Sequence, residues 1–293
     1  MNGLVLIDKP AGCTSHDVVN RWRKLANTKR VGHLGTLDPM ATGLLAIITG
    51  NATRLAQYFE RDDKTYVAEI TFGIVSDTYD VEGEVMATGV AAPADPAVII
   101  AALARYKGRF FQTPPAVSAK KIAGVPAYKL ARKKVPVELK PVEVEIKRLD
   151  VREVSANKLS VTVTSSSGTY IRSLAHDLGQ DLGCGAALSK LRRTNIGDFS
   201  IENARGLDDL AELAANGRLC NAVIPAAQLL PQFPSEYFDT AVEVQIRQGR
   251  DFRTSPFSVR PGAPYVKALS RAGELIAIGE LRIPNVYHPS TVL

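Results

Sequence analysis

The apolar positions of the first fifty residues fall into two short runs, with a helical stretch and a glycine-rich segment between them. Residues 4–7 and 44–48 are continuous apolar runs of a length typical of buried strands. Between them, Thr14 or Ser15 is placed to cap a helix that continues to about residue 26. One face of this helix carries the apolar residues Val18, Val19, Trp22 and Leu25, and the only tryptophan is therefore assigned to the core.

Two kinds of periodicity alternate through the middle of the chain. Residues 64–72 alternate as a strand, with one face made of Tyr66, Ala68, Ile70 and Phe72. Two further apolar segments, residues 142–154 and 159–164, predict a hairpin. Four helices are expected, over residues 53–59, 95–106, 169–182 and 206–216.

The predicted helix over residues 169–182 and the segments that follow it set the domain organisation. The helix over residues 169–182 has an apolar stripe that leaves Tyr170 and Arg172 off its centre. A strand is expected over residues 187–194. Turn-forming residues near 230–234 indicate a boundary, and a strand-turn-strand pattern follows over residues 265–281.

The composition is that of an ordinary soluble protein whose cysteines are expected to be reduced thiols. The 293 residues are enough for one large domain and a small one, and 45% of them are hydrophobic. Three scattered cysteines argue against a disulfide framework and a structural zinc, which fits the cytoplasm. The N-terminal apolar run is too short for a signal peptide, and no apolar span reaches membrane length. We therefore expect a cytoplasmic protein with no membrane partner.

The net charge of +6 permits a polyanionic partner, and its distribution along the chain is uneven. No acid occurs between Val18 and Leu37, where a solvated helix face and a phosphate-contacting edge are both open interpretations. No acid occurs between Pro96 and Val137 either, and this longer segment is predicted to form a basic surface. Its basic residues are Arg105, Lys107, Arg109, Lys120, Lys121, Lys129, Arg132, Lys133 and Lys134.

Aromatic residues are interleaved with the basic residues of this longer segment. Tyr106, Phe110, Phe111 and Tyr128 have rings that could stack on nucleic-acid bases. For the two phenylalanines, packing in the protein core is the preferred interpretation.

The strongest candidate chemistry lies in the glycine-rich segment, residues 32–43. It has three glycines, one proline and a single acid, Asp38, and no helical or strand period, which predicts a shaped loop. Glycines allow a backbone to approach a ligand closely, and Pro39 biases Asp38 away from helical dihedral angles. From the spacing alone, a carboxylate presented to a ligand and a turn in which Asp38 bonds its own backbone both remain open.

A second group of acids occurs at positions 77, 80, 82 and 84. The acids do not alternate as they do in an EF-hand, so calcium binding is not favoured. We expect these side chains, Asp80 in particular, to support the structure of their loop.

The glycine-rich segment resembles the catalytic motif of the TruB-type pseudouridine synthases, which reads G-H-x-G-x-L-D-P-x-A-T-G, at every defined position. Further motifs of that family follow in the same order, and the resemblance runs from about Leu4 to Thr194. The additional matches are Asp8-Lys9-Pro10 with Gly12 and Thr14-Ser15, Lys64-Thr65-Tyr66, Asp77-Thr78-Tyr79-Asp80, Ser118-Ala119-Lys120, Gly168-Thr169-Tyr170-Ile171-Arg172 and Leu191-Arg192-Arg193.

The resemblance implies a fold and an activity. The fold is α+β, a pseudouridine synthase fold whose largely antiparallel mixed sheet is flanked by helices, over residues 1–230. Family members often add a small C-terminal β-rich, PUA-like RNA-binding domain, here expected over residues 235–293. The family converts uridine 55 in the T loop of tRNA to pseudouridine by flipping the base out of the loop. The implied partner is the tRNA T stem-loop, bound by a monomer.

The resemblance also assigns roles to residues. Asp38 is the nucleophile and Arg172 pairs with it, while Tyr66 stacks on the flipped base and is a candidate to accept its C5 proton. Tyr170 and Leu191 wall the base, and His33 fills or borders the gap left by the flipped nucleotide. Lys9 and Asp80 lie in supporting polar motifs. The isomerisation involves no redox change and no net hydrolysis, so no cofactor or metal is expected; the sequence shows no P-loop, dinucleotide fingerprint or metal cluster.

Two alternatives use the same residues differently. A non-catalytic RNA-binding protein would use the basic surface, but it would have no use for an acid at position 38. A glycosidase-like hydrolase would attack an anomeric carbon with a carboxylate, but it usually needs a second carboxylate or a metal. Asp80 is the nearby acid with motif support.

Overall fold

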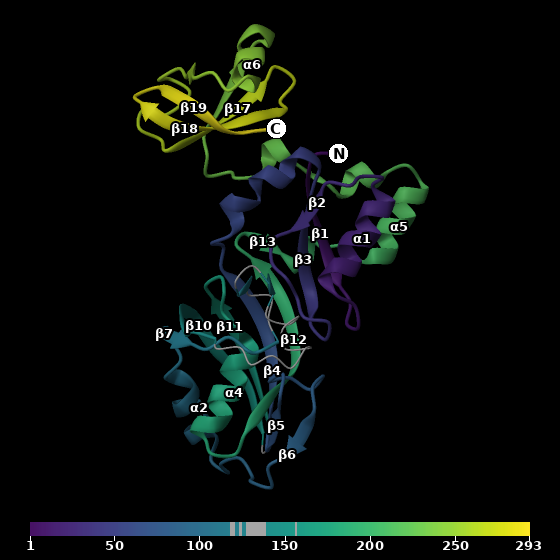
Figure 1. The fold of residues 1–293 in the computed structure, drawn as a ribbon, viewed down its shortest axis with the longest axis vertical. Coiled ribbons are helices and arrows are strands. Elements are labelled where there is room, and N and C mark those ends of the chain that lie inside the picture. The colour runs from purple at the N-terminus through teal and green to yellow at the C-terminus, as the bar shows by residue number, and fades with distance from the viewer. Residues whose placement is uncertain (118–120, 123–124, 127–138, 156) are drawn as a thin grey trace.

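The computed structural model describes residues 1–117, 121–122, 125–126, 139–155 and 157–293, which form a large and a smaller β-sheet with helices around them (Figure 1). Two further sheets have two strands each, β5 (Ile74–Ser76) with β6 (Val85–Ala87) and β8 (Lys121–Ile122) with β9 (Val125–Pro126). Along the main path of the large sheet the strand order is β14 (Ile224–Pro225), β1 (Gly3–Lys9), β3 (Thr42–Thr49), β12 (Ala186–Ile196), β4 (Lys64–Phe72), β11 (Lys158–Ser165), β10 (Val142–Ser155) and β7 (Gly108–Gln112). Two short strands extend it, β2 (Val31–His33) on β3 and β13 (Phe199–Ser200) on β12. The β12–β3 pair is parallel and the other pairs are antiparallel, so the expectation of a largely antiparallel mixed sheet is confirmed.

The two apolar runs near the N-terminus are continuous because both faces of their strands are buried. In β1, Val5 and Ile7 pack into one core cluster, and Leu4 and Leu6 pack into another on the opposite face. Strand β3 divides its residues between the same two clusters in the same way. Successive side chains of a strand point to opposite faces, so a strand that is buried on both faces is apolar at every position.

Helices cover the first of these faces. Helix α1 (Ser15–Leu25) lies beside α5 (Leu207–Ala215) over one end of the sheet, and α2 (Pro96–Ala104) and α4 (Ile171–Asp181) lie over the other end (Figure 1). The predicted start of α1 is confirmed, since Thr14 and Asp17 form a reciprocal capping box. Trp22 is fully buried, as predicted.

The second face is covered by residues 50–59, which form the 3-10 helix η1 (Gly50–Phe59), and by the small domain. The small domain has the strand order β15 (Ser235–Phe238), β17 (Tyr265–Ser270), β18 (Leu275–Ile283), β19 (Val286–Val292) and β16 (Phe252–Arg253), with helix α6 (Thr240–Arg247). The predicted β-rich C-terminal unit and its β17–β18 hairpin are confirmed, whereas α6 and β19 were not predicted.

The two domains contact each other through aromatic rings and hydrogen bonds. Tyr58 of η1 makes edge contacts with Phe233 and Tyr265, and its hydroxyl lies 3.0 Å from the hydroxyl of Thr291. Buried Lys267 donates to two carbonyl oxygens of the segment that joins the domains. The small domain is thus attached beside η1, which leads into β4.

One prediction about the basic segment is wrong. Phe110 packs partly against the core, but Phe111 is 73% exposed, because neighbouring residues of β7 point to opposite faces of the sheet. Tyr128 lies outside the described residues, as do Lys120, Lys129, Arg132, Lys133 and Lys134.

Within the described part of the chain, no helix combines the length and apolar character needed to cross a bilayer.

Candidate active site

The glycine-rich segment leaves β2, turns at Asp38 and enters β3, so both of its ends are fixed in the large sheet. Gly43 has a φ of 100°, and a Cβ atom there would collide with the backbone of Arg193 on β12. This glycine is required twice, for its positive φ and for the close approach of the two strands.

Buried Lys9 fixes the turn from below. It is 0% exposed, and its ammonium donates to the carbonyl oxygens of Pro10, Cys13 and Pro39 at 2.7–3.1 Å. Burial lowers the pKa of Lys9. All three donors of an ammonium are thereby used, one of them on the residue directly after Asp38. The supporting position expected for Lys9 is therefore beneath the loop rather than in the cavity.

Two residues to which the sequence analysis gave no role in the site fix the rest of the turn. Arg193, 1% exposed, donates to the carbonyl oxygens of Gly35, Thr36 and Leu44. The hydroxyl of Ser15 accepts from the amide of Leu37 at 2.8 Å and donates to its carbonyl at 3.0 Å. Arg193 lies in one of the recognised motifs, and that motif was the only signal in the sequence for its function.

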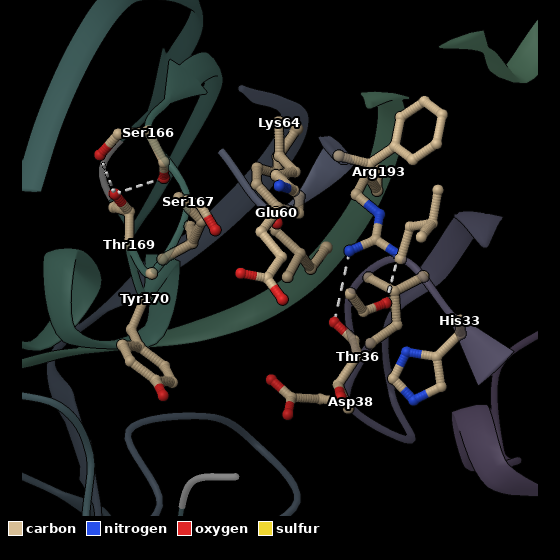
Figure 2. Close-up of a pocket in the computed structure, with 18 of the residues that line it drawn as sticks. His33, Thr36, Asp38, Glu60, Lys64, Ser166, Ser167, Thr169, Tyr170 and Arg193 are labelled. Carbon is tan, nitrogen blue, oxygen red and sulfur yellow. Dashed lines mark hydrogen bonds between the residues drawn. The ribbon is translucent and has the colours of Figure 1, made fainter. Parts of the chain in front are cut away.

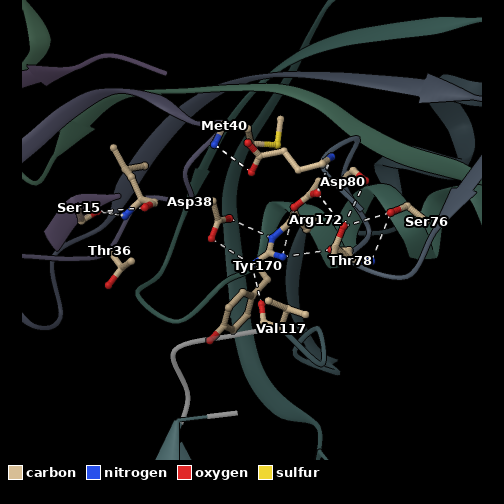
Figure 3. Close-up of polar contacts among 12 residues, drawn as sticks. Ser15, Thr36, Asp38, Met40, Ser76, Thr78, Asp80, Val117, Tyr170 and Arg172 are labelled. Carbon is tan, nitrogen blue, oxygen red and sulfur yellow. Dashed lines mark hydrogen bonds and ion pairs between the residues drawn. The ribbon is translucent and has the colours of Figure 1, made fainter. Parts of the chain in front are cut away.

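Arg172 connects the turn that carries Asp38 to the acidic loop, residues 77–84, on the far side of the site (Figure 3). Its Nε lies 3.0 Å from Oδ2 of Asp38, and one terminal nitrogen donates to Oδ1 of Asp38 at 3.1 Å. The same guanidinium donates to the carbonyl oxygens of Thr78, at 3.1 Å, and Val117, at 2.9 Å, and lies 3.3 Å from Oδ2 of Asp80. The periodicity placed Arg172 off the buried stripe of its helix, yet its side chain is only 6% exposed.

The acidic loop is held by its own backbone, as was expected for structural support. Asp80 accepts from the hydroxyl of Thr78 at 2.7 Å and from the amide of Glu82 at 3.0 Å. Glu82 in turn accepts from the amide of Met40 at 3.2 Å and thereby contacts the loop of Asp38. Among the described residues, no group of three or more His, Cys, Asp or Glu side chains is arranged to hold a metal.

The electrostatics of Asp38 combine two opposed effects. Burial raises the pKa of its carboxyl, and the Arg172 guanidinium opposes that rise. Its side chain is still 32% exposed, on the side that faces the cavity. The result is a carboxylate that is held rigidly, is less solvated than in water, and is open to a ligand. Such a group is suited to act as a nucleophile or base.

The cavity above Asp38 has a volume of about 670 Å³. Its lining includes all six residues to which the resemblance gave a direct role: His33, Asp38, Tyr66, Tyr170, Arg172 and Leu191. Figure 2 shows the carboxylate of Asp38 facing Tyr170 across the cavity, with His33 on the other side. Residues from β2, β4, β12 and the start of α4 are therefore brought together, and Asp38 is the one acid of these six.

One lining residue is positioned by a neighbour that the sequence did not reveal. Tyr170 is fixed through its backbone, because the side-chain amide of buried Gln112 accepts from its N–H at 2.8 Å and donates to its carbonyl at 3.0 Å.

His33 is half-buried, and burial lowers its pKa, so its ring is neutral at pH 7. A neutral imidazole borders the cavity next to the cationic Arg193.

Charged groups at the rim were also missed as lining residues. Arg61, Lys64 and Arg193 line one wall of the cavity together with Glu60 (Figure 2). The hydroxyl-bearing loop at residues 166–169 forms the opposite wall. Arg61 is exposed, whereas Lys64 and Arg193 are only 7% and 1% exposed. A cavity with cationic walls and a carboxylate at its floor suits a ligand that carries phosphate beside a neutral ring.

Comparison with known proteins supplies independent evidence. The family description "TruB family pseudouridylate synthase (N terminal domain)" matches residues 23–171, and "tRNA pseudouridylate synthase B C-terminal domain" matches residues 172–230. The chain is 49% identical to the tRNA pseudouridine synthase B of Solibacter usitatus over 293 residues, which cover both proteins completely. It is 43% identical to that of Opitutus terrae over 231 residues, 79% of this chain and 95% of the relative.

Solved structures share the fold. One, described as "Crystal Structure of a Cbf5-Nop10-Gar1 Complex", superposes with a TM-score of 0.71 at 26% identity, over 97% of this chain and 79% of that chain. Another, described as "Structure of H/ACA RNP bound to a substrate RNA containing 2'-deoxyuridine", has a TM-score of 0.71 at 23% identity, over 99% of this chain and 84% of that chain. Both likenesses extend over the large sheet and the small domain.

Proposed function

The chain belongs to the TruB family of pseudouridylate synthases, and from this premise we propose that it isomerises uridine 55 in the T loop of tRNA to pseudouridine, with Asp38 as the nucleophile and without a cofactor. The observation that supports this most is the ion pair of Asp38 and Arg172 at the floor of a cavity walled by Tyr66, Tyr170 and Leu191. The cavity offers a carboxylate to one nucleotide and excludes the rest of the RNA.

The reaction breaks the bond between ribose C1′ and base N1, turns the base and joins C1′ to C5. The proton on C5 is lost and N1 gains one, so the product has the composition of the substrate. Flipping the uridine out of its loop costs a few kcal/mol, about what stacking on one aromatic ring returns. Tyr66 is the proposed ring, and Tyr170 and Leu191 confine the detached base so that it rejoins the same ribose.

The remaining members of the site have positioning roles in this proposal. Arg172 keeps Asp38 ionised and oriented, and Asp80 and Lys9 hold Arg172 and the loop of Asp38. His33 borders the space from which the nucleotide is flipped. Asp80 is 3% exposed and already accepts two hydrogen bonds, so it is not free to activate water for a hydrolase.

We propose in addition that residues 1–230 form the catalytic domain and residues 235–293 a PUA-like domain that contacts RNA. The boundary lies just before β15, and the small domain exposes arginines together with Tyr237 and the fully exposed Phe257. The protein is proposed to act as a monomer on tRNA in the cytoplasm.

The test is direct. The purified protein is incubated with a tRNA transcript that carries tritium at C5 of its uridines, and tritium release is followed. One equivalent of tritium per tRNA is expected, with pseudouridine mapped to position 55 and none released from a transcript with cytidine there. Tritium release from other positions would contradict the proposed site, and free uracil would indicate hydrolysis instead.

Replacing Tyr66 with Phe separates the two functions proposed for its side chain. The Tyr66→Phe variant retains the stacking face and should bind tRNA within about threefold of the parent. Without the hydroxyl, the single-turnover rate should fall by about 10²-fold, the typical contribution of a positioned acid or base. Rapid-quench measurements at saturating enzyme check this. A parent-like rate would show that Tyr66 is a stacking surface alone.

Binding of tRNA should depend steeply on salt. Each phosphate contacted by a Lys or Arg releases counterions, so the affinity should fall by at least about tenfold between about 50 and 200 mM monovalent salt. Filter binding with the catalytically inactive Asp38→Asn variant isolates binding from turnover. An affinity independent of salt would mean that the exposed cations of the protein, Arg61 at the cavity among them, do not contact the RNA backbone.

A further inference from the structure

The residues on both sides of Tyr79 hold the guanidinium of Arg172. The carbonyl oxygen of Thr78 accepts from it at 3.1 Å, and the carboxylate of Asp80 lies 3.3 Å from the same nitrogen (Figure 3). Both groups point at one side chain because the chain reverses direction between them, at Tyr79. The orientation of Arg172, and through it of Asp38, therefore depends on the conformation of a single residue.

That conformation is unusual. Tyr79 has a φ of 65°, in the left-handed region that a bulky side chain rarely adopts. Its backbone is tied on both sides, to the carbonyl of Ser76 at 3.2 Å and to the amide of Leu188 on β12 at 3.0 Å. These hydrogen bonds secure the backbone but leave the tyrosine ring to be placed by another contact.

The ring of Tyr79 stacks on the ring of His176. The two centroids are 3.9 Å apart and the planes are inclined by 12°. His176 lies on α4 four residues after Arg172, which places both side chains on the same face of the helix. Helix α4 therefore contacts the loop of residues 78–80, the reversed loop, at two places. Arg172 contacts Thr78 and Asp80, and one turn later the imidazole of His176 stacks on Tyr79.

The surroundings of His176 indicate that stacking is what holds its ring. Its Nδ1 atom is buried and has no hydrogen-bond partner among the described residues. Burial lowers the pKa of the imidazole, so the ring is neutral at pH 7. A neutral, hydrogen-bond-poor imidazole in parallel contact with a phenol ring acts here as a flat surface.

We propose that His176 and Tyr79 are a positioning pair, which fixes the reversed loop so that Thr78 and Asp80 hold Arg172 against the catalytic Asp38. The inference rests on the proposed function, since it assigns the pair a role in the chemical step. It predicts that loss of the stack slows the reaction without weakening tRNA binding, because neither ring lines the cavity.

The test compares His176→Ala, which removes the ring, with His176→Phe, which keeps a flat ring on α4. His176→Ala should lower the single-turnover rate at least about tenfold, since small displacements of catalytic groups are costly, and leave the Kd for tRNA within about threefold. His176→Phe should restore the rate to within about threefold of the parent. The conservative control Tyr79→Phe retains the ring and should match the parent.

A second variant breaks the same stack from the loop side, without a change in helix α4. Asparagine tolerates the left-handed backbone but has no ring, so Tyr79→Asn should show the same loss as His176→Ala. Because both changes break one contact, the double variant should be no slower than either single variant to within about twofold. Additive losses would contradict a shared role.

The pH profile supplies a readout that a merely structural role would not move. The charged groups around Asp38 are Arg172, Asp80 and Lys9. Arg172 lowers the pKa of Asp38, so the pKa should rise when the guanidinium is held less firmly against the carboxylate. The acidic limb of the single-turnover rate should therefore move to higher pH in His176→Ala and return in His176→Phe. A parent-like rate and limb in His176→Ala would overturn the proposal, as would a loss that His176→Phe does not restore at an unchanged melting temperature. Inactivity of the parent protein would instead refute the proposed function.

Discussion

The Asp38→Asn variant is expected to lose turnover by at least about 10³-fold, the scale seen when a catalytic nucleophile is removed. Asparagine has nearly the same shape as aspartate, but it carries no negative charge and is a poor nucleophile. The cavity walls and the cations that line it remain, so tRNA should bind within about threefold of the parent. Tritium release from C5-labelled tRNA and filter binding measure the two quantities separately.

The matched control is Asp63→Asn. Asp63 is as exposed as Asp38, 33% against 32%, and also forms an ion pair, with Lys147 at 2.7 Å, but it does not line the catalytic cavity. It should retain turnover within about threefold, since a partly exposed ion pair contributes little. Tritium release at the parent rate by the Asp38→Asn variant would remove Asp38 from the mechanism, whereas a parent protein that binds tRNA and releases no tritium would support the non-catalytic RNA-binding interpretation.

The second large effect is expected for Arg172→Lys. A guanidinium contacts Asp38 through two nitrogens and also reaches Thr78, Val117 and Asp80, whereas an ammonium is a single point with three donors. The charge is kept but the orientation of Asp38 is lost, so the single-turnover rate should fall by about 10²-fold. The affinity for tRNA should change little, because Arg172 is only 5% exposed and its guanidinium is bonded to groups of the protein.

The same variant should alter the pH dependence, with a definite sign. Asp38 must be ionised to react, so activity is present above its pKa and is lost as the pH falls through it. Burial raises this pKa and Arg172 opposes the rise, so a weaker contact at position 172 leaves the pKa higher. The acidic limb of the rate should therefore move to higher pH in Arg172→Lys.

Arg148→Lys is the control for the charge-conserving change. Arg148 also pairs with an aspartate, Asp150, but it is 70% exposed and lies on β10. Its replacement should leave both the rate and the acidic limb unchanged. An Arg172→Lys variant that reacts as fast as the parent would show that charge alone, and not the geometry of the guanidinium, is what Asp38 needs.

Elements whose signals are local could be predicted from the sequence. Helix α1 begins where the Thr14–Asp17 capping box stands, and β4 covers the residues predicted from its alternation. Family membership could also be predicted, because the motif around Asp38 is a contiguous stretch whose residues are all constrained by one turn. These features depend on residues that are near one another in the chain.

The burial of charged residues could not be predicted in this way. Local periodicity placed Arg172 off the buried stripe of its helix, and gave no reason to bury Lys9 or Arg193. A charge is buried only where partners satisfy it, and for Arg172 the carboxylate partner Asp38 is 134 residues away in the sequence. For Phe111 the reverse holds, since it lies on the edge strand β7 and, among the described residues, no element covers its side of the sheet.

The sequence by itself therefore determined six strands of the large sheet (β1, β3, β4, β10, β11 and β12), the loop that carries Asp38 and the family to which the chain belongs. Only the tertiary structure decided that Arg172 reaches Asp38, that Lys9 and Arg193 lie beneath the loop, and that Tyr79 stacks on His176. The physical reason is that backbone conformation follows from neighbouring residues. The environment of a polar side chain, by contrast, depends on which distant segments the folded chain brings to it.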